Sequence, residues 1–286
     1  MKSIIYFFQF IFISFLFIIF WFLGLKISTN FASLLFKIIG PLFRSKQLIE
    51  KNIQKAFPDI NKNDLDKIVT NMWGNYGRIL AEYIFLKEYR KPNSRKNFEI
   101  IGQDILDEVK KSKKPVIFIS GHFNNFELMA MHIEKSGIDV AAIYRPLNNK
   151  FLNRIMERIR KKYICKNQIK KGFAGTRQLL SYFKKGHSIA LMIDQRVSQG
   201  IKSNFFKHDA YTTTIPAQFV KKFNCKIVPI YIERTGNNNF KLTISTPIEY
   251  SKDYSIEDIT LNLNHYLEKM ILKNPTQWIW SHNRWK

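Results

Sequence analysis

The feature that most constrains this chain is an uncharged apolar run near its N-terminus. The 22 residues of Ile4–Leu25 contain no charged side chain and many aromatic ones. At a rise of about 1.5 Å per residue, a helix of this length spans roughly 33 Å, enough to cross a hydrocarbon layer of about 30 Å. A secretory signal peptide is the alternative, but its apolar run is shorter, and Gly24-Leu25-Lys26-Ile27 is a poor cleavage site. The run therefore predicts a membrane anchor, which we place at residues 1–27.

Basic residues flank this run unevenly. Lys2 alone precedes it, whereas Lys26 and five further Lys or Arg residues follow within the next 30 positions. By the positive-inside rule, the body of the protein is expected in the cytoplasm. Residues 28–95 read as a helical, membrane-proximal segment with an apolar face. Within it, Phe57-Pro58-Asp59 ends one helix, and Asn63 or Asp64 is expected to cap the next.

Composition narrows the class of protein further. Hydrophobic residues make up 45% of the chain, which excludes wholesale disorder. The two cysteines, Cys165 and Cys225, are too few for a disulfide scaffold, and neither belongs to a C-x-x-C pair. The net charge of +24 points to an anionic partner. A coding bias toward A/T-rich codons, which favours Lys, Asn, Ile and Phe together, explains much of that charge equally well.

Beyond the helical segment, short apolar strands alternate with amphipathic helices. We expect strands at residues 116–120, 140–144, 188–193, 227–232 and 240–245. This alternation predicts an α/β domain over residues 96–286, with a mixed, largely parallel sheet flanked by helices. Ligands of such domains bind beyond the carboxyl ends of the strands.

One candidate site lies where the first of these strands ends. His122 follows Ser120-Gly121 and precedes the next helix, and Glu127 stands five residues further on. On a single helix the two side chains would point about 140° apart, so they converge only if His122 precedes the helix. A histidine held by a carboxylate can take a proton from a hydroxyl. The alternative is a histidine that follows a strand and has no catalytic function, because a histidine and an acidic residue five positions apart often occur by chance.

Two further charged residues are candidates. Asp194 ends the apolar strand Leu191-Met192-Ile193, where an Asp that only caps the following turn is the alternative. Arg160 lies about 80° from the centre of the apolar stripe of its helix, closer than its neighbouring arginines. Its guanidinium is expected to hold an anion or the carboxylate of Glu127, unless it extends along the helix edge to water.

The chain as a whole resembles the late acyltransferases of lipid A biosynthesis, the lauroyl/myristoyl transferase family. The blocks that carry the resemblance are Asn52-Ile53-x-x-Ala56-Phe57-Pro58, Gly121-His122-Phe123-Asn124-Asn125-Phe126-Glu127, Tyr144-Arg145-Pro146-x-x-Asn149, Asp194-Gln195, Phe205-Phe206, Ala210-x-Thr212-Thr213-Thr214, Val228-Pro229 and Pro275-x-Gln277-Trp278-x-Trp280-x-His282-x-Arg284. The chain departs from the family at Asn124 and Lys207, which stand where glycine is usual.

This resemblance implies a function and a set of site residues. It implies transfer of a fatty acyl group from acyl carrier protein to a hydroxyl of a lipid A precursor, at the cell inner membrane, on a fold like that of glycerolipid acyltransferases. The family's catalytic histidine and acid fall on His122 and Glu127, and its motif arginine and aspartate on Arg160 and Asp194. Substrate contacts are implied at Arg145, Asn149, Gln195 and Thr213.

The expected mechanism has His122 as general base, with Glu127 orienting it. It needs no metal, no cofactor and no covalent acyl-enzyme, since acyl carrier protein delivers the acyl group as a co-substrate. The expected partners are acyl carrier protein, the lipid A precursor and the membrane, and not nucleic acid. A glycerophospholipid or other glycolipid acyltransferase is the nearest alternative, although glycerophospholipid acyltransferases usually have Asp at the position of Glu127. A membrane-anchored basic binding module is the alternative outside enzymes.

Overall fold

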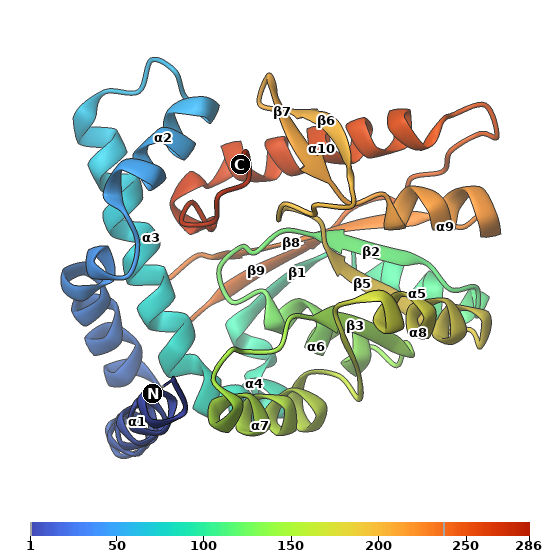
Figure 1. The fold of residues 1–286 in the computed structure, drawn as a ribbon. Coiled ribbons are helices and arrows are strands. Elements are labelled where there is room, and N and C mark those ends of the chain that lie inside the picture. Colours follow the sequence, from blue (N-terminus) through green and yellow to red (C-terminus); the bar gives the residue numbers. More distant parts are fainter. Residues whose placement is uncertain (1, 237) are drawn as a thin grey trace.

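The computed structural model describes residues 2–236 and 238–286, which form an α/β domain with a layer of helices at one side (Figure 1). The α-helices are α1 Lys2–Ile39, α2 Lys46–Ala56, α3 Lys62–Glu82, α4 Leu86–Arg90, α5 Gln103–Ser112, α6 Glu127–Lys135, α7 Lys150–Ile159, α8 Phe173–Lys184, α9 Ile215–Phe223 and α10 Ile256–Lys273. Short 3₁₀ segments are η1 Gly40–Leu42, η2 Tyr83–Phe85, η3 Pro92–Asn97 and η5 Pro275–Gln277, and η4 Arg160–Ile164 is a π-helical turn. The strands are β1 Phe98–Ile101, β2 Ile117–Ser120, β3 Val140–Tyr144, β4 Asn167–Lys170, β5 Ser188–Met192, β6 Ile201–Phe205, β7 His208–Thr212, β8 Ile227–Arg234 and β9 Phe240–Ile244.

A mixed sheet forms the centre of the domain. Its order in the described residues is β1-β9-β8-β2-β5-β3-β4, and every neighbouring pair is parallel except β8 and β9. All four residues of β2 are buried, as expected for a central strand covered on both faces. Helices α5, α6 and α8 contact the strands of the sheet, while β6 and β7 form a separate antiparallel hairpin. The predicted mixed, largely parallel α/β fold is confirmed.

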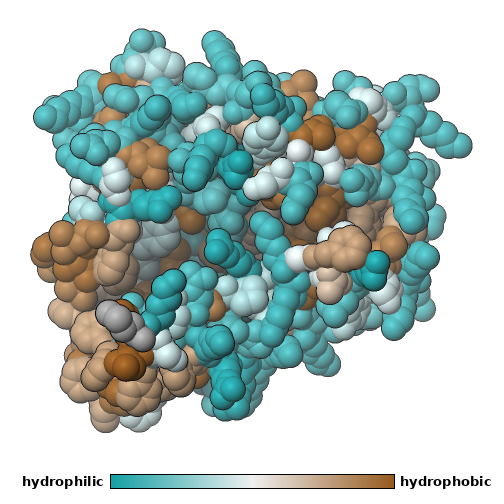
Figure 2. Space-filling model, in the orientation of Figure 1, coloured by the Kyte–Doolittle hydropathy of each residue, from teal (hydrophilic) through white to brown (hydrophobic). Residues whose placement is uncertain are grey.

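Helix α1 is the one helix among the described residues that is long and apolar enough to cross a membrane. Only 6% of its most apolar stretch is buried, and Figure 2 shows apolar side chains gathered over this part of the molecule, at lower left. The helix is kinked at Gly24, whose φ of 72° lies in the region that favours glycine. Ser28 Oγ lies 2.7 Å from the carbonyl oxygens of both Phe20 and Gly24 and can donate to them where the kink interrupts the helix.

Both halves of α1 rest on the remainder of the protein. The second half packs along α3, where a Cβ added at Gly77 would lie 2.0 Å from the carbonyl oxygen of Ala32. Glycine at position 77 is therefore needed for the two helix backbones to approach this closely. The first half reaches α7, where Asn149 Nδ2 donates to the carbonyl oxygen of Tyr6 at 2.8 Å and the ring of Phe7 contacts that of Phe151.

Several element boundaries differ from the sequence prediction. The N-cap of α3 is Asn61, which accepts from the backbone N–H of Asp64 at 2.9 Å, so the expectation of Asn63 or Asp64 is wrong. The sequence predicts a helix from about Asn124 to Lys135, but α6 begins at Glu127, because Asn124 has a φ of 44° and belongs to the preceding turn. Lys207 likewise has a φ of 59°. Both departures from the family's usual glycines thus occupy the left-handed region, which asparagine tolerates best after glycine.

Candidate active site

A cavity of about 640 Å³ extends along the face of the sheet over β2, β3 and β5 and past the carboxyl ends of these strands. Phe118, Ala190 and Ala142 stand side by side in the register of these three strands and all line it. The two alanines leave space above the sheet that larger side chains would fill, and methionine, isoleucine and leucine side chains add to the apolar wall. The cavity is therefore apolar along the sheet, as an alkyl chain requires.

His122 stands at the mouth of this cavity and is held by Asp194. Its Nδ1 lies 2.8 Å from Asp194 Oδ1, and its backbone N–H donates to Asp194 Oδ2, also at 2.8 Å. The two residues meet because β2 and β5 are adjacent parallel strands, so the residues that follow them emerge at the same edge. A carboxylate can only accept, so Nδ1 carries the proton and Nε2 keeps its lone pair.

Asp194 itself is fully buried and has three hydrogen-bond donors. Besides the two from His122, Trp278 Nε1 donates to Oδ2 at 2.8 Å. Burial alone raises the pKa of the Asp194 carboxyl, but its charge interaction and hydrogen bonds with His122, together with the Trp278 bond, outweigh burial and hold the pKa at about 2. Asp194 is therefore an ionised, oriented carboxylate across the neutral pH range.

Glu127 does not orient His122, and this part of the expected mechanism is wrong. Its carboxylate accepts from Arg160, with Nε at 2.8 Å and Nη2 at 2.6 Å from Oε1, and from the hydroxyl of Tyr83. The physical reason is the late start of α6, which leaves His122 in a turn facing Asp194 while Glu127 points from the first helical position toward the buried guanidinium. The alternative that Arg160 binds the Glu127 carboxylate is confirmed.

The Glu127–Arg160 pair is buried and tightly connected. The exposed fractions of the two side chains are 8% for Glu127 and 11% for Arg160, and Tyr83 also accepts from Arg160 Nη2 at 2.9 Å. Burial alone would lower the pKa of Arg160, but the charges of Glu127 and Tyr83 and the hydrogen bonds to both residues together outweigh burial and raise that pKa. The pair joins α6 and the π-helical turn to the residue that follows α3.

A second buried charge pair supports the turn between His122 and Glu127. Arg234 Nη1 lies 2.6 Å from Glu82 Oε1, and both side chains are buried. Glu82 Oε2 accepts from Asn125 Nδ2 at 2.9 Å, while Arg234 Nη2 donates to Asn124 Oδ1, also at 2.9 Å. The two asparagines of the turn are thus fixed from both sides.

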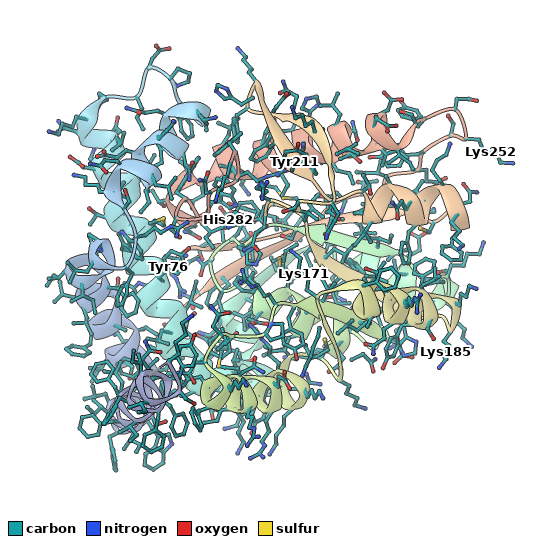
Figure 3. The ribbon with its side chains drawn as sticks, viewed as in Figure 1. Tyr76, Lys171, Lys185, Tyr211, Lys252 and His282 are labelled. Carbon is teal, nitrogen blue, oxygen red and sulfur yellow. The ribbon has the colours of Figure 1, made fainter. Side chains whose placement is uncertain are left out.

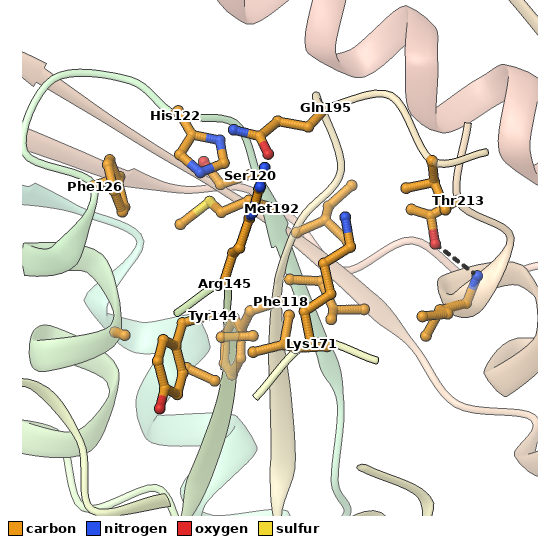
Figure 4. Close-up of a pocket in the computed structure, with 18 of the residues that line it drawn as sticks. Phe118, Ser120, His122, Phe126, Tyr144, Arg145, Lys171, Met192, Gln195 and Thr213 are labelled. Atoms are coloured by element: carbon orange, nitrogen blue, oxygen red, sulfur yellow. Dashed lines mark hydrogen bonds between the residues drawn. The ribbon is translucent and has the colours of Figure 1, made fainter. Parts of the chain in front are cut away.

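The four expected substrate contacts separate into two groups. Arg145, Gln195 and Thr213 line the cavity, and Figure 4 shows Gln195 extending toward His122 above Arg145. Asn149 is not among the lining residues, because its side chain caps α7, accepting from the N–H of Phe151 at 3.1 Å, and donates to Tyr6 of α1. Its expected role as a substrate contact is therefore not supported by its position.

Three residues of the site were missed by the sequence prediction. Lys171 lines the cavity together with Arg145, Tyr83 binds Glu127, and Trp278 binds Asp194. Burial and the nearby Arg145 charge lower the pKa of Lys171, and among the described residues neither cation has an acidic partner. Trp278 belongs to the C-terminal block that carries the family resemblance, so the sequence marked it as a family residue but did not indicate its function. Nothing in the sequence pattern around Lys171 or Tyr83 marked either residue as part of the site.

The fold and this site define a class of protein. An oriented histidine at the mouth of an apolar cavity, on a chain with a membrane-length helix, is the arrangement expected of an enzyme that handles acyl chains at a membrane. Residues 3–286 match the sequence profile of the bacterial lipid A biosynthesis acyltransferases, and the chain belongs to that family. It is thus an acyltransferase of lipid A biosynthesis.

Individual relatives agree with this assignment. The lipid A biosynthesis palmitoleoyltransferase of Escherichia coli (strain K12) is 23% identical over 250 residues, which cover 86% of this chain and 80% of the relative. The lauroyltransferase of the same organism is 23% identical over 255 residues, covering 85% and 79%. Its myristoyltransferase is 20% identical over 248 residues, covering 85% and 75%.

The Glu127–Arg160 pair leads to a test of stability. We expect Glu127→Ala to lower the free energy of unfolding by about 3–5 kcal/mol, because Arg160 is left buried without its carboxylate. Glu99→Ala is the matched control: it removes a carboxylate 2.6 Å from Lys241 at the surface and should cost less than about 1 kcal/mol. Denaturant unfolding of the detergent-solubilised variants measures both. Equal stability of the two variants would contradict the structural role of Glu127.

Proposed function

We propose that this protein transfers a fatty acyl group from acyl carrier protein to a hydroxyl of a lipid A precursor, with His122 as general base. The observation that carries the proposal is the hydrogen bond between His122 Nδ1 and Asp194, because it leaves Nε2 with a free lone pair at the cavity mouth. Asp194, rather than Glu127, orients the ring and stabilises the imidazolium that forms.

The reaction proceeds in two proton-coupled stages. The acceptor hydroxyl attacks the thioester carbonyl carbon while its proton moves to His122 Nε2, and the carbonyl electrons move onto oxygen. The resulting tetrahedral intermediate then collapses, the carbon–sulfur bond breaks, and the proton passes from His122 to the leaving thiolate. The products are an ester and the free thiol of the carrier.

The cavity supports an acyl chain and an anionic donor arm. The apolar wall over Phe118, Ala142 and Ala190 fits the alkyl chain, while Arg145 and Lys171 reach toward the same space as His122 (Figure 4). These two cations have no acidic partner among the described residues, so a bound phosphate would be stabilised by their charge and hydrogen bonds. We assign them to the phosphodiester of the phosphopantetheine arm of acyl carrier protein.

The acyl group passes directly between the two substrates in this proposal. Burial raises the pKa of both the Cys165 and the Cys225 thiol to about 12, so neither is a ready nucleophile at neutral pH. No serine of the chain stands in a G-x-S-x-G elbow. We therefore propose a direct transfer without an acyl-enzyme and without a metal or cofactor.

Helix α1 provides the location. We propose that residues 1–27 anchor the chain in the inner membrane, that residues 28–95 lie close to it, and that residues 96–286 act on the cytoplasmic side. The supporting observations are the exposed apolar surface of α1 and the six basic residues between positions 26 and 55. The net charge of +24 suits acidic acyl carrier protein, lipid phosphates and an anionic leaflet.

Lipid A from living cells tests the function. Cells that lack the gene should make lipid A with one acyl chain fewer than the parent. A wild-type copy should restore that chain, whereas a His122→Ala copy should not, since the base is absent. Mass spectrometry of purified lipid A measures the difference. His265→Ala, on an exposed position of α10, is the control and should restore the chain. An unchanged acyl pattern in the deletion would contradict the proposal and favour a glycerophospholipid acyltransferase.

The role of Asp194 is tested by Asp194→Asn. Oδ2 accepts two N–H groups, so the asparagine oxygen should take that place and its NH₂ should face His122 Nδ1. The ring would then carry its proton on Nε2 and lose its function as a base. We expect kcat to fall by about 10⁴, by analogy with the same change in a Ser-His-Asp triad. Asp253→Asn, at an exposed position, is the control. Near-normal turnover of Asp194→Asn would exclude this mechanism.

The orientation is tested with epitope tags at the two termini. In cells stripped of the outer membrane, added protease should remove an N-terminal tag and leave a C-terminal tag intact, and permeabilisation should expose both. Protection of both tags before permeabilisation would show that α1 lies along the cytoplasmic face. The contacts of Tyr6 and Phe7 with α7 fit that arrangement, whereas a full span requires them to break, and the proposed span would then be wrong.

A further inference from the structure

A second histidine lies at the same cavity as His122. His282 lines it, and its Nε2 lies 3.1 Å from the backbone nitrogen of Arg196, two residues beyond Asp194. In Figure 3 it lies between Tyr76 of the helical layer and Lys171. The C-terminal block that contains it, Trp278–Arg284, has one assigned function so far, the hydrogen bond from Trp278 to Asp194.

The hydrogen bond from Arg196 decides where the proton of His282 resides. A backbone N–H can only donate, so Nε2 must accept with its lone pair, and Nδ1 of the neutral ring carries the hydrogen. Burial, together with the charges of His122, Arg284 and Arg44, outweighs Asp194 and lowers the pKa of His282 to about 4, which keeps the ring neutral. Among the described residues no group bonds to Nδ1, and this nitrogen is not one of the enclosed polar atoms. The ring therefore offers one free N–H.

The backbone around His282 is fixed from several directions. Asn52 Nδ2 donates to the carbonyl oxygens of both Trp280 and His282, each at 2.9 Å. Arg44 Nε donates to the carbonyl oxygen of Ser281 at 3.0 Å, and Tyr76 bonds to the Ser281 hydroxyl at 2.9 Å. The ring of His282 is thus oriented before any substrate arrives, which is the condition for electrostatic catalysis.

We propose that the Nδ1–H group of His282 donates a hydrogen bond to the thioester carbonyl oxygen as negative charge develops on it. The inference rests on the proposed function and adds a second catalytic histidine with a different task. His122 takes the hydroxyl proton, whereas His282 keeps its own proton throughout and stabilises the oxyanion until the carbon–sulfur bond breaks.

Other donors near His122 are less suited to this task. The backbone N–H of His122 is bonded to Asp194. The guanidinium of Arg160 is bonded to Glu127 and Tyr83 through Nε and Nη2, and its Nη1, which has no partner among the described residues, is enclosed within the protein. Gln195 faces the cavity, but no hydrogen bond orients its side chain among the described residues, so the substrate would have to order it. His282 differs from these groups in having both a free N–H and a direction set by a hydrogen bond of the protein.

The test compares His282→Phe with His282→Asn in steady-state transfer from acyl carrier protein. Phenylalanine keeps a ring but no donor, and we expect kcat to fall about 10²–10³-fold with KM changed less than about threefold. In His282→Asn, Nδ2 takes the place of Nδ1, although the side chain is too short for Oδ1 to replace Nε2 at Arg196, so kcat should stay at least tenfold above that of His282→Phe. His265→Phe is the control for loss of a histidine and should behave as the wild type.

Two results would overturn the inference. One is a His282→Phe enzyme within threefold of wild-type kcat. The other is a His282→Asn enzyme that melts like the wild type but has lost kcat more than about a hundredfold, a criterion that holds even if His282→Phe does not fold. Failure of the proposed function is recognised separately, because the wild-type enzyme itself would then transfer no acyl group in the same assay.

Discussion

The geometry of the site depends on one buried carboxylate and the three N–H groups that surround it. Asp194 lies in the protein interior, where an ionised group is tolerated only if its lone pairs are used. Two of its donors come from the turn after β2, and the third comes from Trp278, more than 80 residues further along the chain. The same interaction therefore orients the histidine and joins three distant segments around the cavity mouth.

The position of the site could be predicted from the sequence, but its pairing could not. A histidine and an aspartate each following an apolar strand were sufficient to place His122 and Asp194 at one edge of a parallel sheet. The spacing of His122 and Glu127 suggested a direct pair instead. Whether the two side chains meet depends on where α6 begins. Asn124 adopts a left-handed backbone conformation, so the helix starts only at Glu127, and the spacing of apolar residues in the sequence does not reveal this later start.

The parts of the fold that escaped prediction share a physical cause. β1, β4 and the two strands of the β6–β7 hairpin are four or five residues long and only partly buried, so polar and apolar residues alternate weakly in them. Strands of this kind are specified by their neighbours more than by their own composition. The central strands, by contrast, are continuous apolar runs, and their positions were predicted to within a few residues.

The site depends on the segment around Trp278 and His282, which is synthesised last. This dependence sets the order in which the parts of the protein are completed during translation. During synthesis the apolar helix emerges first and can reach the lipid layer while most of the sheet is still unmade. The Asp194 carboxylate, which holds the ring of His122, lacks its indole donor until translation has passed position 278. The apolar helix that could anchor the chain and the hydrogen-bonded site around Asp194 are thus completed at different times, with the helix first and the site last.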